Sequence, residues 1–256
     1  MHTIDQNFKG ATIIRGDTLE VLKSFPDKLF GGIITDPPYA SGAATQNGKQ
    51  QSTSKKYSSF KGSCPFPDFE GDAKDQRNWT NWMTEFLIEA RRVTKPGAPI
   101  CMFIDWRQLP SLTDALQWAG WIWRGTLVWD KTNSRPQRGR FRQQAEFVVW
   151  GSNGHMSADR KAPVLPGVFR QSMPPAVKRI HQTEKPLELM RDLTKIVEPG
   201  GIILDPFAGA GTTVLAAKLE GYPAVGIELS DYYADAALKR IDDYDVDAVA
   251  SADLTA

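Results

Sequence analysis

Seven short apolar runs, rich in isoleucine and valine, constrain the fold of this chain most strongly. Most of them lack the alternation of apolar and polar residues that marks a strand with one solvent face, so we expect strands that are buried on both faces. A sheet of such strands needs helices on both sides. The runs occupy residues 11–16, 31–36, 98–105, 126–131, 146–152, 201–206 and 224–230.

Helical patterns separate several of these runs. The first ends in basic residues and a Pro-Gly pair, and the second opens with a proline, which are the usual stop and start signals. Strands that alternate with helices predict an α/β fold, with a Rossmann-like, seven-stranded, mostly parallel sheet and helices on both faces. The helical segments are 78–97, 186–197, 212–221 and 231–244.

The length of 256 residues fits one α/β domain with a sizeable core, and we expect a single domain over residues 1–256. Residues 40–75 are rich in Ser, Gly, Gln and Lys without periodicity, so we expect a mobile loop insertion there. Residues 153–180 contain four prolines and little pattern.

Composition excludes several classes of protein. Two cysteines and three scattered histidines favour neither a disulfide framework, nor a zinc site, nor a Ser-His-Asp triad, and we expect no metal. No apolar run approaches the roughly 18 residues of a membrane helix, and the N-terminal residues lack a signal-peptide pattern, so we expect a cytoplasmic protein. The net charge of +1 means that any nucleic-acid surface must be local.

Residues 202–230 form the most informative stretch. A strand reaches Asp205, a turn contains Gly209 and Gly211, and a helix begins near Thr212. Glycines allow close approach of a ligand, and a helix N-terminus offers free N–H groups. Glu228 ends the next strand 17 residues after Gly211, where an acid can accept hydrogen bonds from both hydroxyls of a ribose.

The glycine turn and Glu228 could instead belong to a nicotinamide-dependent oxidoreductase, which is the first alternative. Its fingerprint requires Gly-x-Gly-x-x-Gly, whereas "GAGTTV" places Val214 at the third glycine. Asp205 and Phe207 are not part of that fingerprint either. A simple tight turn between strand and helix is the other alternative.

Two motifs together carry a resemblance to a known family. "DPFAGAGTT" (205–213) with Glu228 resembles the S-adenosylmethionine site of DNA methyltransferases that modify exocyclic amines, and "DPPY" (36–39) resembles their catalytic motif. "HQTEKP" (181–186) and "IIRGDTLEVL" (13–22) resemble segments of the beta-type, circularly permuted group, which includes bacterial and bacteriophage DNA adenine methylases. The resemblance implies the permuted methyltransferase order of the fold.

The resemblance also implies S-adenosylmethionine as the cofactor and a set of residues around it. Asp17 has a helix cap as an equal alternative, and Lys185 could be a solvated charge ahead of a helix. The implied roles are wrapping the cofactor for Asp205, Phe207, Gly209 and Gly211, holding its ribose for Glu228, facing its adenine for Asp17, and reaching its methionine carboxylate for Thr183 and Lys185.

The motif "DPPY" supplies what methyl transfer to an exocyclic amine requires. The lone pair of the amine is delocalised into the base, so acceptors for both N–H groups make the nitrogen more nucleophilic and stabilise its developing positive charge. Asp36 and the carbonyl of Pro37 are the candidate acceptors. Pro37 and Pro38 hold the turn rigid, and Tyr39 offers a ring face for the base.

A target base in double-stranded DNA must be flipped out of the helix to reach such a site. The family resemblance implies that the strands 31–36 and 201–206 are neighbours in the sheet. Ligands of open α/β sheets bind at such a switch point, beyond the carboxyl ends of the strands. The methyl donor and the acceptor nitrogen would therefore meet there.

Two segments are candidates for DNA contact. Residues 132–180 are predicted to be a small DNA-recognition segment, because they open with a basic stripe that contains no acid between Asp130 and Glu146. A solvated loop is the plain alternative. The candidate DNA-binding residues are Arg135, Arg138, Arg140 and Arg142 in the stripe, beside Lys131, and Lys55 and Lys56 in the 40–75 loop.

Several apolar residues are assigned to the core by default. Cys101 lies in the run "APICMFID", and most of the eight tryptophans, including Trp118 and Trp150, are expected to be buried. Trp106 and Arg107 follow a strand at the predicted active edge. Trp106 is expected either to pack there or to line the target pocket.

The favoured reaction is N6-methylation of adenine in DNA, because the acid form "DPPY" resembles the adenine enzymes. The alternatives are methylation of cytosine N4, then of RNA or a protein amide, and then a nonenzymatic DNA-binding protein that would not need Asp36. Similar enzymes often dimerise, so a homodimer is a candidate assembly. Neither the recognition sequence nor a role in restriction, a bacteriophage or regulation can be read from these residues.

Overall fold

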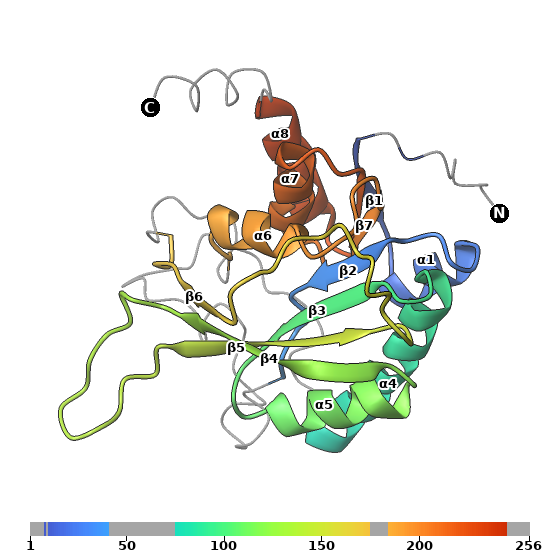
Figure 1. Ribbon diagram of the computed structural model, residues 1–256. Helices are drawn as coiled ribbons and strands as arrows, with labels where there is room; N and C mark the ends of the chain where they lie inside the picture. Colours follow the sequence, from blue (N-terminus) through green and yellow to red (C-terminus); the bar gives the residue numbers. More distant parts are fainter. Residues whose placement is uncertain (1–7, 9, 41–74, 175–183, 245–256) are drawn as a thin grey trace.

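A mixed, mostly parallel sheet forms the centre of the computed structural model, which describes residues 8, 10–40, 75–174 and 184–244 (Figure 1). The sheet has eight strands in the order β1-β8-β7-β2-β3-β5-β4-β6. The strands are β1 (Ala11–Arg15), β2 (Gly32–Thr35), β3 (Pro99–Ile104), β4 (Ile122–Asp130), β5 (Ala145–Ser152), β6 (Val168–Arg170), β7 (Ile203–Asp205) and β8 (Ala224–Glu228).

All seven predicted strands are present, and β5 runs antiparallel to both of its neighbours, β3 and β4. Every other pairing in the sheet is parallel. The predicted number of seven strands was wrong, because β6 adds an eighth at the edge. This strand is three residues long and buries only Phe169, so it leaves no periodic signal in the sequence.

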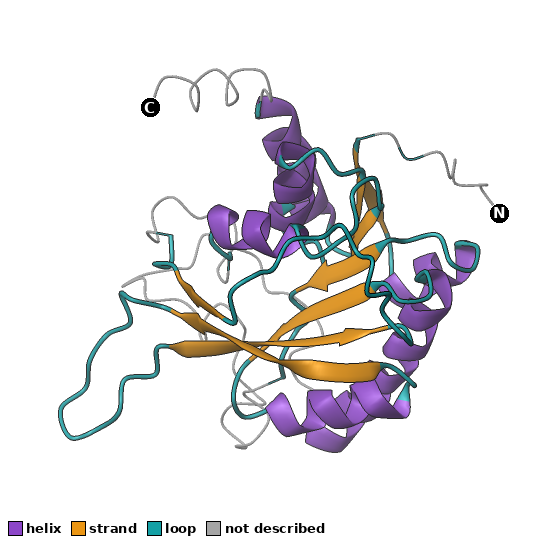
Figure 2. Ribbon diagram, viewed as in Figure 1, coloured by secondary structure: helices purple, strands orange, loops and turns teal. Residues whose placement is uncertain are grey.

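Six helices are described, and four of them match the predicted segments (Figure 2). The sequence analysis did not predict α1 or α5. The helix α1 has only seven residues, and Asp17 caps it by accepting hydrogen bonds from the N–H groups of Leu19 and Glu20. The helices are α1 (Thr18–Ser24), α4 (Gln76–Val93), α5 (Leu109–Trp118), α6 (Leu187–Thr194), α7 (Thr212–Leu219) and α8 (Asp231–Asp243).

Helices cover both faces of the sheet, as the predicted strands require (Figure 1). Successive residues of a strand point to opposite faces. Ile33 of β2 therefore packs into the cluster formed with α1, α4 and α5, while Ile34 packs into the cluster formed with α6, α7 and α8. Both isoleucines are fully buried, which explains why the strand shows no alternation in its sequence.

The assignment of tryptophans to the core was wrong for Trp118, whose side chain is 68% exposed. The buried face of α5 carries Leu112, Ala115 and Leu116 at helical spacing, so a residue two positions further on points away from the core. Trp150 is half-buried, and Cys101 is buried as expected.

The strands β2 and β7 are direct neighbours, which confirms the adjacency that the resemblance implied. They pair in parallel, so Thr35 and Asp205 end at the same edge of the sheet, and the Thr35 hydroxyl donates a hydrogen bond of 2.6 Å to Asp205 Oδ1. Strand order reverses at this pair, because the chain builds outward in one direction from β7 and in the other from β2. Across the described ranges, no helix is both long and apolar enough to cross a membrane.

Candidate active site

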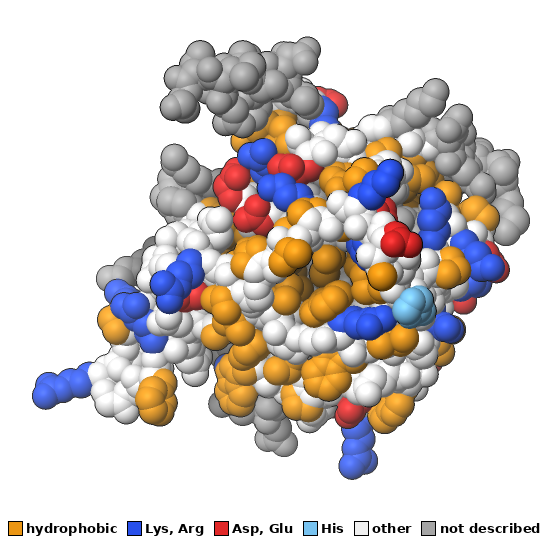
Figure 3. All heavy atoms as spheres, viewed as in Figure 1, with side chains coloured by type: hydrophobic (Ala, Val, Ile, Leu, Met, Phe, Trp, Pro, Cys, Tyr) orange, Lys and Arg blue, Asp and Glu red, His pale blue; other side chains and the backbone are white. Residues whose placement is uncertain are grey.

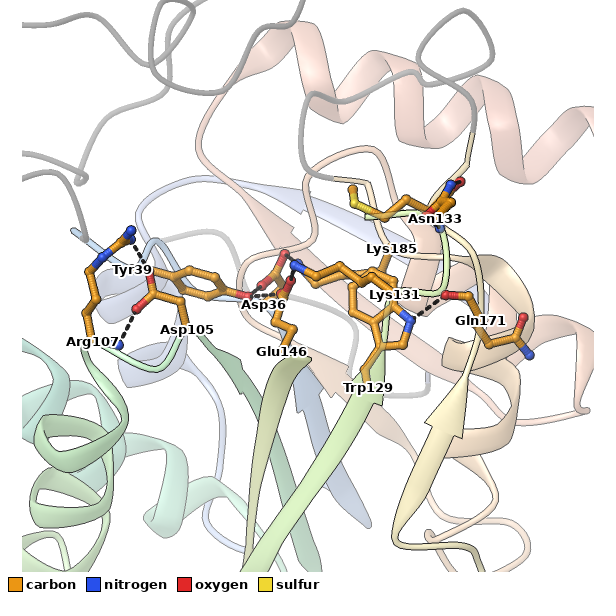
Figure 4. A network of polar contacts seen from close by, with 11 residues as sticks. Asp36, Tyr39, Asp105, Arg107, Trp129, Lys131, Asn133, Glu146, Gln171 and Lys185 are labelled. Carbon is orange, nitrogen blue, oxygen red and sulfur yellow. Dashed lines mark hydrogen bonds and ion pairs between the residues drawn. The ribbon is translucent and has the colours of Figure 1, made fainter. Parts of the chain in front are cut away.

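The turn that follows β2 is held at both ends. The Tyr39 hydroxyl oxygen lies 2.5 Å from Asp36 Oδ1 and 2.7 Å from Glu146 Oε1, so it can donate its proton to either carboxylate (Figure 4). The indole N–H of Trp79, on α4, donates a hydrogen bond of 2.7 Å to the carbonyl of Pro38. The orientation of the turn therefore depends on residues far away in the sequence.

Two carboxylates and two ammonium groups meet at this turn (Figure 4). The Lys185 ammonium pairs with Asp36 Oδ2 at short range and with Glu146 Oε1 at 3.2 Å. Lys131 Nζ lies 2.8 Å from Glu146 Oε2. Lys185 is only 6% exposed and Glu146 only 8%, whereas the side chains of Asp36 and Lys131 are 23% and 19% exposed, so the balanced charges lie in a partly buried site.

The reversed direction of β5 places Glu146 in the site. Glu146 is the second residue of β5, and its neighbour Phe147 lies opposite Ile104, the last residue of β3. The beginning of this antiparallel strand therefore lies at the same edge as the carboxyl ends of β2 and β3. Lys131, directly after β4, reaches the same edge from the next strand.

Burial and charge shift the titration of these groups in different directions. Burial raises the pKa of Asp36, the Lys185 ammonium opposes that rise, and the Glu146 carboxylate adds to it. Burial alone would raise the pKa of Glu146, but Lys185 and Lys131 outweigh it and lower that pKa to about 2. Burial disfavours the charged form of Lys185, but Asp36 and Glu146 together raise its pKa.

The glycine turn after β7 has the backbone that the sequence predicts. Gly209 and Gly211 have φ angles of +51° and +74°, and Gly211 caps α7. A Cβ atom at Gly211 would lie 2.9 Å from the Cβ of Ala237 on α8, so the close packing of α7 and α8 also requires glycine there. The Gly209 N–H donates to Glu228 Oε2 and the Gly211 N–H to the Ala208 carbonyl, so the glycines allow close approach to the backbone rather than offering free donors.

Two acids hold this turn, and one of them keeps capacity for a ligand. Asp205 is 2% exposed and accepts hydrogen bonds from Thr35 and from the N–H of Phe207, at 3.1 Å, so its carboxylate faces the protein. Glu228 accepts one backbone N–H on each oxygen, from Gly209 and from Ser230, both at 2.8 Å. Each oxygen of Glu228 retains a lone pair that could accept a ribose hydroxyl.

The structure places the remaining cofactor candidates in different ways. Phe207 is half-buried, and its ring lies 5.1 Å from the ring of Phe86 on α4. Asp17 is the N-cap of α1, which confirms the helix-cap alternative, while its contact with an adenine stays a prediction. The hydroxyl of Thr18 donates a hydrogen bond of 2.6 Å to the Pro206 carbonyl and so brings this segment to the glycine turn.

The segment before α6 joins the two halves of the site. Thr183 lies outside the described residues. Lys185 has Asp36 and Glu146 as its partners, so its predicted contact with a methionine carboxylate stays a prediction, and it is not the solvated charge of the alternative. Glu184 pairs at 2.9 Å with Arg240 of α8, which also donates to the Thr212 hydroxyl at the start of α7.

The basic stripe forms a loop between β4 and β5 that projects away from the sheet (Figure 1). Lys and Arg side chains gather along this projection, and Phe141 near them is fully exposed (Figure 3). The ion pairs of the described ranges near this loop involve Lys131 and Arg170 rather than its four predicted DNA-binding arginines. Those exposed residues are Arg135, Arg138, Arg140 and Arg142.

Other predicted DNA contacts have a different outcome. Lys131 pairs with Glu146 beside the turn that follows β2, and its predicted place in the phosphate-binding stripe stays a prediction. Lys55 and Lys56 lie outside the described residues. Trp106 is 57% exposed and does not pack in the core, and Arg107 pairs with Asp105 beside the Tyr39 ring (Figure 4).

Glu146, Trp79 and Arg240 were not predicted from the sequence as site residues. Glu146 carried a weak signal, since a charged residue at the start of an apolar strand must be paired if it is buried. Trp79 and Arg240 lie in ordinary amphipathic helices and carried none.

The arrangement suits a nucleotide-like cofactor and a polar acceptor. The close backbone approach at the glycines and the spare lone pairs of Glu228 fit a ribose-bearing ligand. Asp36 directly follows Thr35, whose hydroxyl donates to Asp205 at the start of the glycine turn. Among the described residues, no group of three or more His, Cys, Asp or Glu side chains could hold a metal ion.

Comparisons with known proteins agree with this geometry. The family model for DNA methylases of the N6/N4 type matches residues 31–239. The chain is 26% identical over 255 residues to the type II methyltransferase M.HinfI of Haemophilus influenzae, covering 90% of this chain and 68% of that protein.

Solved structures share the fold. The complex of M1.HpyAVI with S-adenosylmethionine superposes with a TM-score of 0.64 at 23% identity, over 90% of this chain and 98% of the other. The PvuII DNA methyltransferase, which is cytosine-N4-specific, gives a TM-score of 0.64 at 17% identity, over 93% of this chain and 94% of the other.

Proposed function

The chain belongs to the N6/N4 DNA methylase family, and from this membership we propose that it transfers a methyl group from S-adenosylmethionine to the N6 amine of a flipped-out adenine in double-stranded DNA. One observation carries the proposal. The hydrogen bond between Thr35 and Asp205 joins the turn with the candidate acceptors to the turn with the candidate cofactor site. The two reactants of a methyl transfer need this proximity.

The glycine turn and Glu228 would hold the cofactor, which supplies an activated methyl group when bound. Gly209 and Gly211 would let the ligand approach the backbone closely at the N-terminus of α7, and Glu228 offers acceptors for the ribose. Phe207, Asp17, Thr183 and Lys185 complete the proposed binding residues. Asp205 would act indirectly, by fixing the turn through the N–H of Phe207.

Asp36 and the Pro37 carbonyl would accept the two N–H groups of the target amine. The Pro38 carbonyl already accepts a hydrogen bond from Trp79, which favours Pro37 as the second acceptor. As the amine nitrogen gains positive charge, an ionised Asp36 stabilises it more than it stabilises the neutral ground state. Tyr39 would fix Asp36 through its hydroxyl and offer its ring to the flipped base.

The arginines of the β4–β5 loop would contact DNA phosphates. They are exposed on a projection that begins and ends in the catalytic network, at Lys131 and Glu146. Phosphate contacts there would position the duplex over the site without reading its sequence. The recognition role of residues 132–180 remains part of this proposal.

Adenine is favoured over cytosine on one sequence feature, the acid in "DPPY". The fold does not separate the two bases, since a cytosine-N4-specific enzyme shares it. Because both amines need the same pair of acceptors, the mechanism accommodates cytosine N4 as the alternative product.

The test is transfer of a labelled methyl group from S-adenosylmethionine to unmethylated DNA, followed by mass spectrometry of the nucleosides. Wild-type protein should label adenine N6, Asp36→Ala should not, and Asp114→Ala, which removes an exposed acid of α5, should match the wild type. Label on cytosine N4 would change the substrate and keep the mechanism. Label on RNA or protein alone, or no label with the cofactor bound, would overturn the proposal.

A further inference from the structure

We propose that Lys185 and Glu146 are positioning residues that act through Asp36: Lys185 keeps the Asp36 carboxylate ionised, and Glu146 fixes both the Lys185 ammonium and the Tyr39 hydroxyl around it. The inference rests on the proposed function, because it takes Asp36 as the group that accepts a hydrogen bond from the target amine. Neither residue belongs to the "DPPY" turn. Glu146 lies 107 positions after Tyr39, its partner.

The burial of this ion-pair network indicates a role other than stability. Lys185 and Glu146 are each more than nine-tenths buried. Removing such charges from water takes several kcal/mol per ion, and well-packed apolar residues often serve the fold as well or better. The Lys185 ammonium also contacts Asp36 and Glu146 at the same time. It can therefore balance the charges of two carboxylates that both lie next to the Tyr39 hydroxyl.

The charges around Asp36 come from every neighbouring element. Lys185 contacts Asp36 directly from the segment before α6. Negative groups approach from β5, as Glu146, and from β7, as Asp205, which Thr35 connects to the end of β2. Tyr39 donates a hydrogen bond from the turn itself.

Two further charged groups lie one step away. Lys131 contacts Glu146 rather than Asp36. Asp105 and Arg107 at the end of β3 pair with each other beside the Tyr39 ring, so their charges cancel (Figure 4). Lys185 is therefore the one cation of the described chain in direct contact with Asp36.

The consequence is a pH dependence with opposite signs for the two residues. Without Lys185, the partly buried Asp36 faces Glu146 and Asp205 without a cation in direct contact, so it should take up a proton at higher pH than in the wild type. A protonated carboxyl has lost part of its capacity to accept from an amine. Without the charge of Glu146, Asp36 loses a repelling neighbour and keeps Lys185, so it should stay ionised to lower pH.

The experiment is the single-turnover rate of methyl transfer between pH 5 and 9 for Lys185→Met, Lys185→Arg, Glu146→Gln and Lys131→Met. The acid limb of the pH–rate profile should move to higher pH in Lys185→Met. If its midpoint lies above pH 7, the rate at pH 7 should fall by about tenfold for each pH unit between them. It should move to lower pH in Glu146→Gln. Lys185→Arg should restore the wild-type profile, and Lys131→Met should shift the limb least.

A second measurement reads the ionisation of Asp36 without catalysis. The protein is labelled with ¹³C at aspartate carboxyl carbons, the Asp36 resonance is assigned with Asp36→Asn, and its titration is followed in the wild type and variants. The midpoint should rise in Lys185→Met and fall in Glu146→Gln. This readout does not need catalysis. If the wild type methylates no DNA, the proposed function is overturned, and the titration still reports whether Lys185 and Glu146 control the charge of Asp36.

Other outcomes would overturn the inference. Equal loss of rate at every pH, or shifts of the same sign in both variants, would show that the residues only support the fold. Weaker binding of S-adenosylmethionine by Lys185→Met, with an unmoved Asp36 titration, would leave Lys185 with its proposed cofactor contact alone. Thermal melting of each variant separates these outcomes from unfolding.

Discussion

Asp205 illustrates, at the scale of one residue, how a site acid can serve the turn rather than the ligand. Its carboxylate is buried and accepts hydrogen bonds from Thr35 and from the N–H of Phe207. Burial raises its pKa to about 6, although these hydrogen bonds and one from Thr213 oppose the rise. The ionised Asp205 carboxylate therefore holds the glycine turn, but its ionisation in the folded chain lowers the free energy of unfolding.

The replacement Asp205→Asn tests this cost. Between the ordinary pKa of 3.8 and about 6, the folded chain holds a proton that the unfolded chain releases. The contribution of this proton to the free energy of unfolding is fully present below the unfolded pKa of 3.8. It is lost as the pH rises through the folded pKa of about 6. The free energy of unfolding of the variant, relative to the wild type, should therefore increase from pH 4 to pH 7, by up to about 3 kcal/mol.

Urea denaturation at pH 4.5, 6 and 7.5 measures this difference. Asparagine also loses one acceptor, but that loss is the same at each pH. Asp114→Asn, at an exposed position of α5, should change nothing across the range. A constant difference between variant and wild type would show that Asp205 does not titrate abnormally.

The helix α4 supports the catalytic turn at the scale of elements. Trp79 is fully buried, and its indole N–H donates to the Pro38 carbonyl. Trp121 offers a matched case elsewhere, because its buried indole N–H donates a hydrogen bond of 2.9 Å to the carbonyl of Leu87, about two turns further along α4 than Trp79. The two tryptophans differ in the element whose position they fix.

Replacing each tryptophan by phenylalanine separates packing from positioning. Each variant loses one hydrogen bond, which should reduce the free energy of unfolding by about 1–3 kcal/mol. Only Trp79→Phe should lower the rate of methyl transfer, because only that bond orients the turn that carries Asp36. The measurements are urea denaturation and single-turnover rates, and equal rates in both variants would contradict the role of α4.

The β4–β5 loop makes a prediction about salt. Each arginine that neutralises a phosphate releases counterions, so Arg138→Ala with Arg140→Ala should weaken DNA binding and reduce the magnitude of the slope of log K against log salt by up to about 2. Phe141→Ala in the same loop removes no charge and should keep the slope. Lys239→Ala on the exposed surface of α8 should change neither quantity.

Fluorescence anisotropy with labelled DNA at several salt concentrations measures both effects. An unchanged slope in the double variant would make the loop a solvated surface, as the plain alternative has it. A change of slope in Lys239→Ala would show that the whole surface, rather than the loop, contacts DNA.

The sequence predicted what local physics determines. The run that contains Ile33 and Ile34 is typical of a strand because the two side chains are buried on opposite faces, and the glycines at 209 and 211 predict their turn by their backbone freedom. The pairing of β2 with β7 came from the family resemblance. The strand β6 was missed because three residues carry no period.

The catalytic network was predicted only in part, because it depends on the whole sheet. Asp36 and Tyr39 are neighbours in sequence, but Glu146 reaches them only because β5 reverses direction beside β3. No local pattern records the direction of a strand. The same limit applies to Lys185, which reaches Asp36 from 149 positions away.

The candidate cofactor site lies on the main division of the molecule, since the sheet builds outward from β7 and β2 in opposite directions. A ligand held there contacts segments from both halves and should stabilise the whole chain against unfolding. At a hundred times its dissociation constant, S-adenosylmethionine should add about 2.7 kcal/mol, which for a chain of this size raises the melting temperature by roughly 5–10 °C.

Two variants divide binding from catalysis in this measurement. Glu228→Ala loses the proposed ribose acceptor, so its affinity should fall by about 10- to 100-fold and the thermal shift at the same concentration by half or more. Asp36→Ala lies on the acceptor side and should keep the full shift while losing methyl transfer. Differential scanning fluorimetry with and without cofactor gives both values. A full shift in Glu228→Ala would remove Glu228 from the site, and a lost shift in Asp36→Ala would mean that the two halves of the site bind the cofactor together.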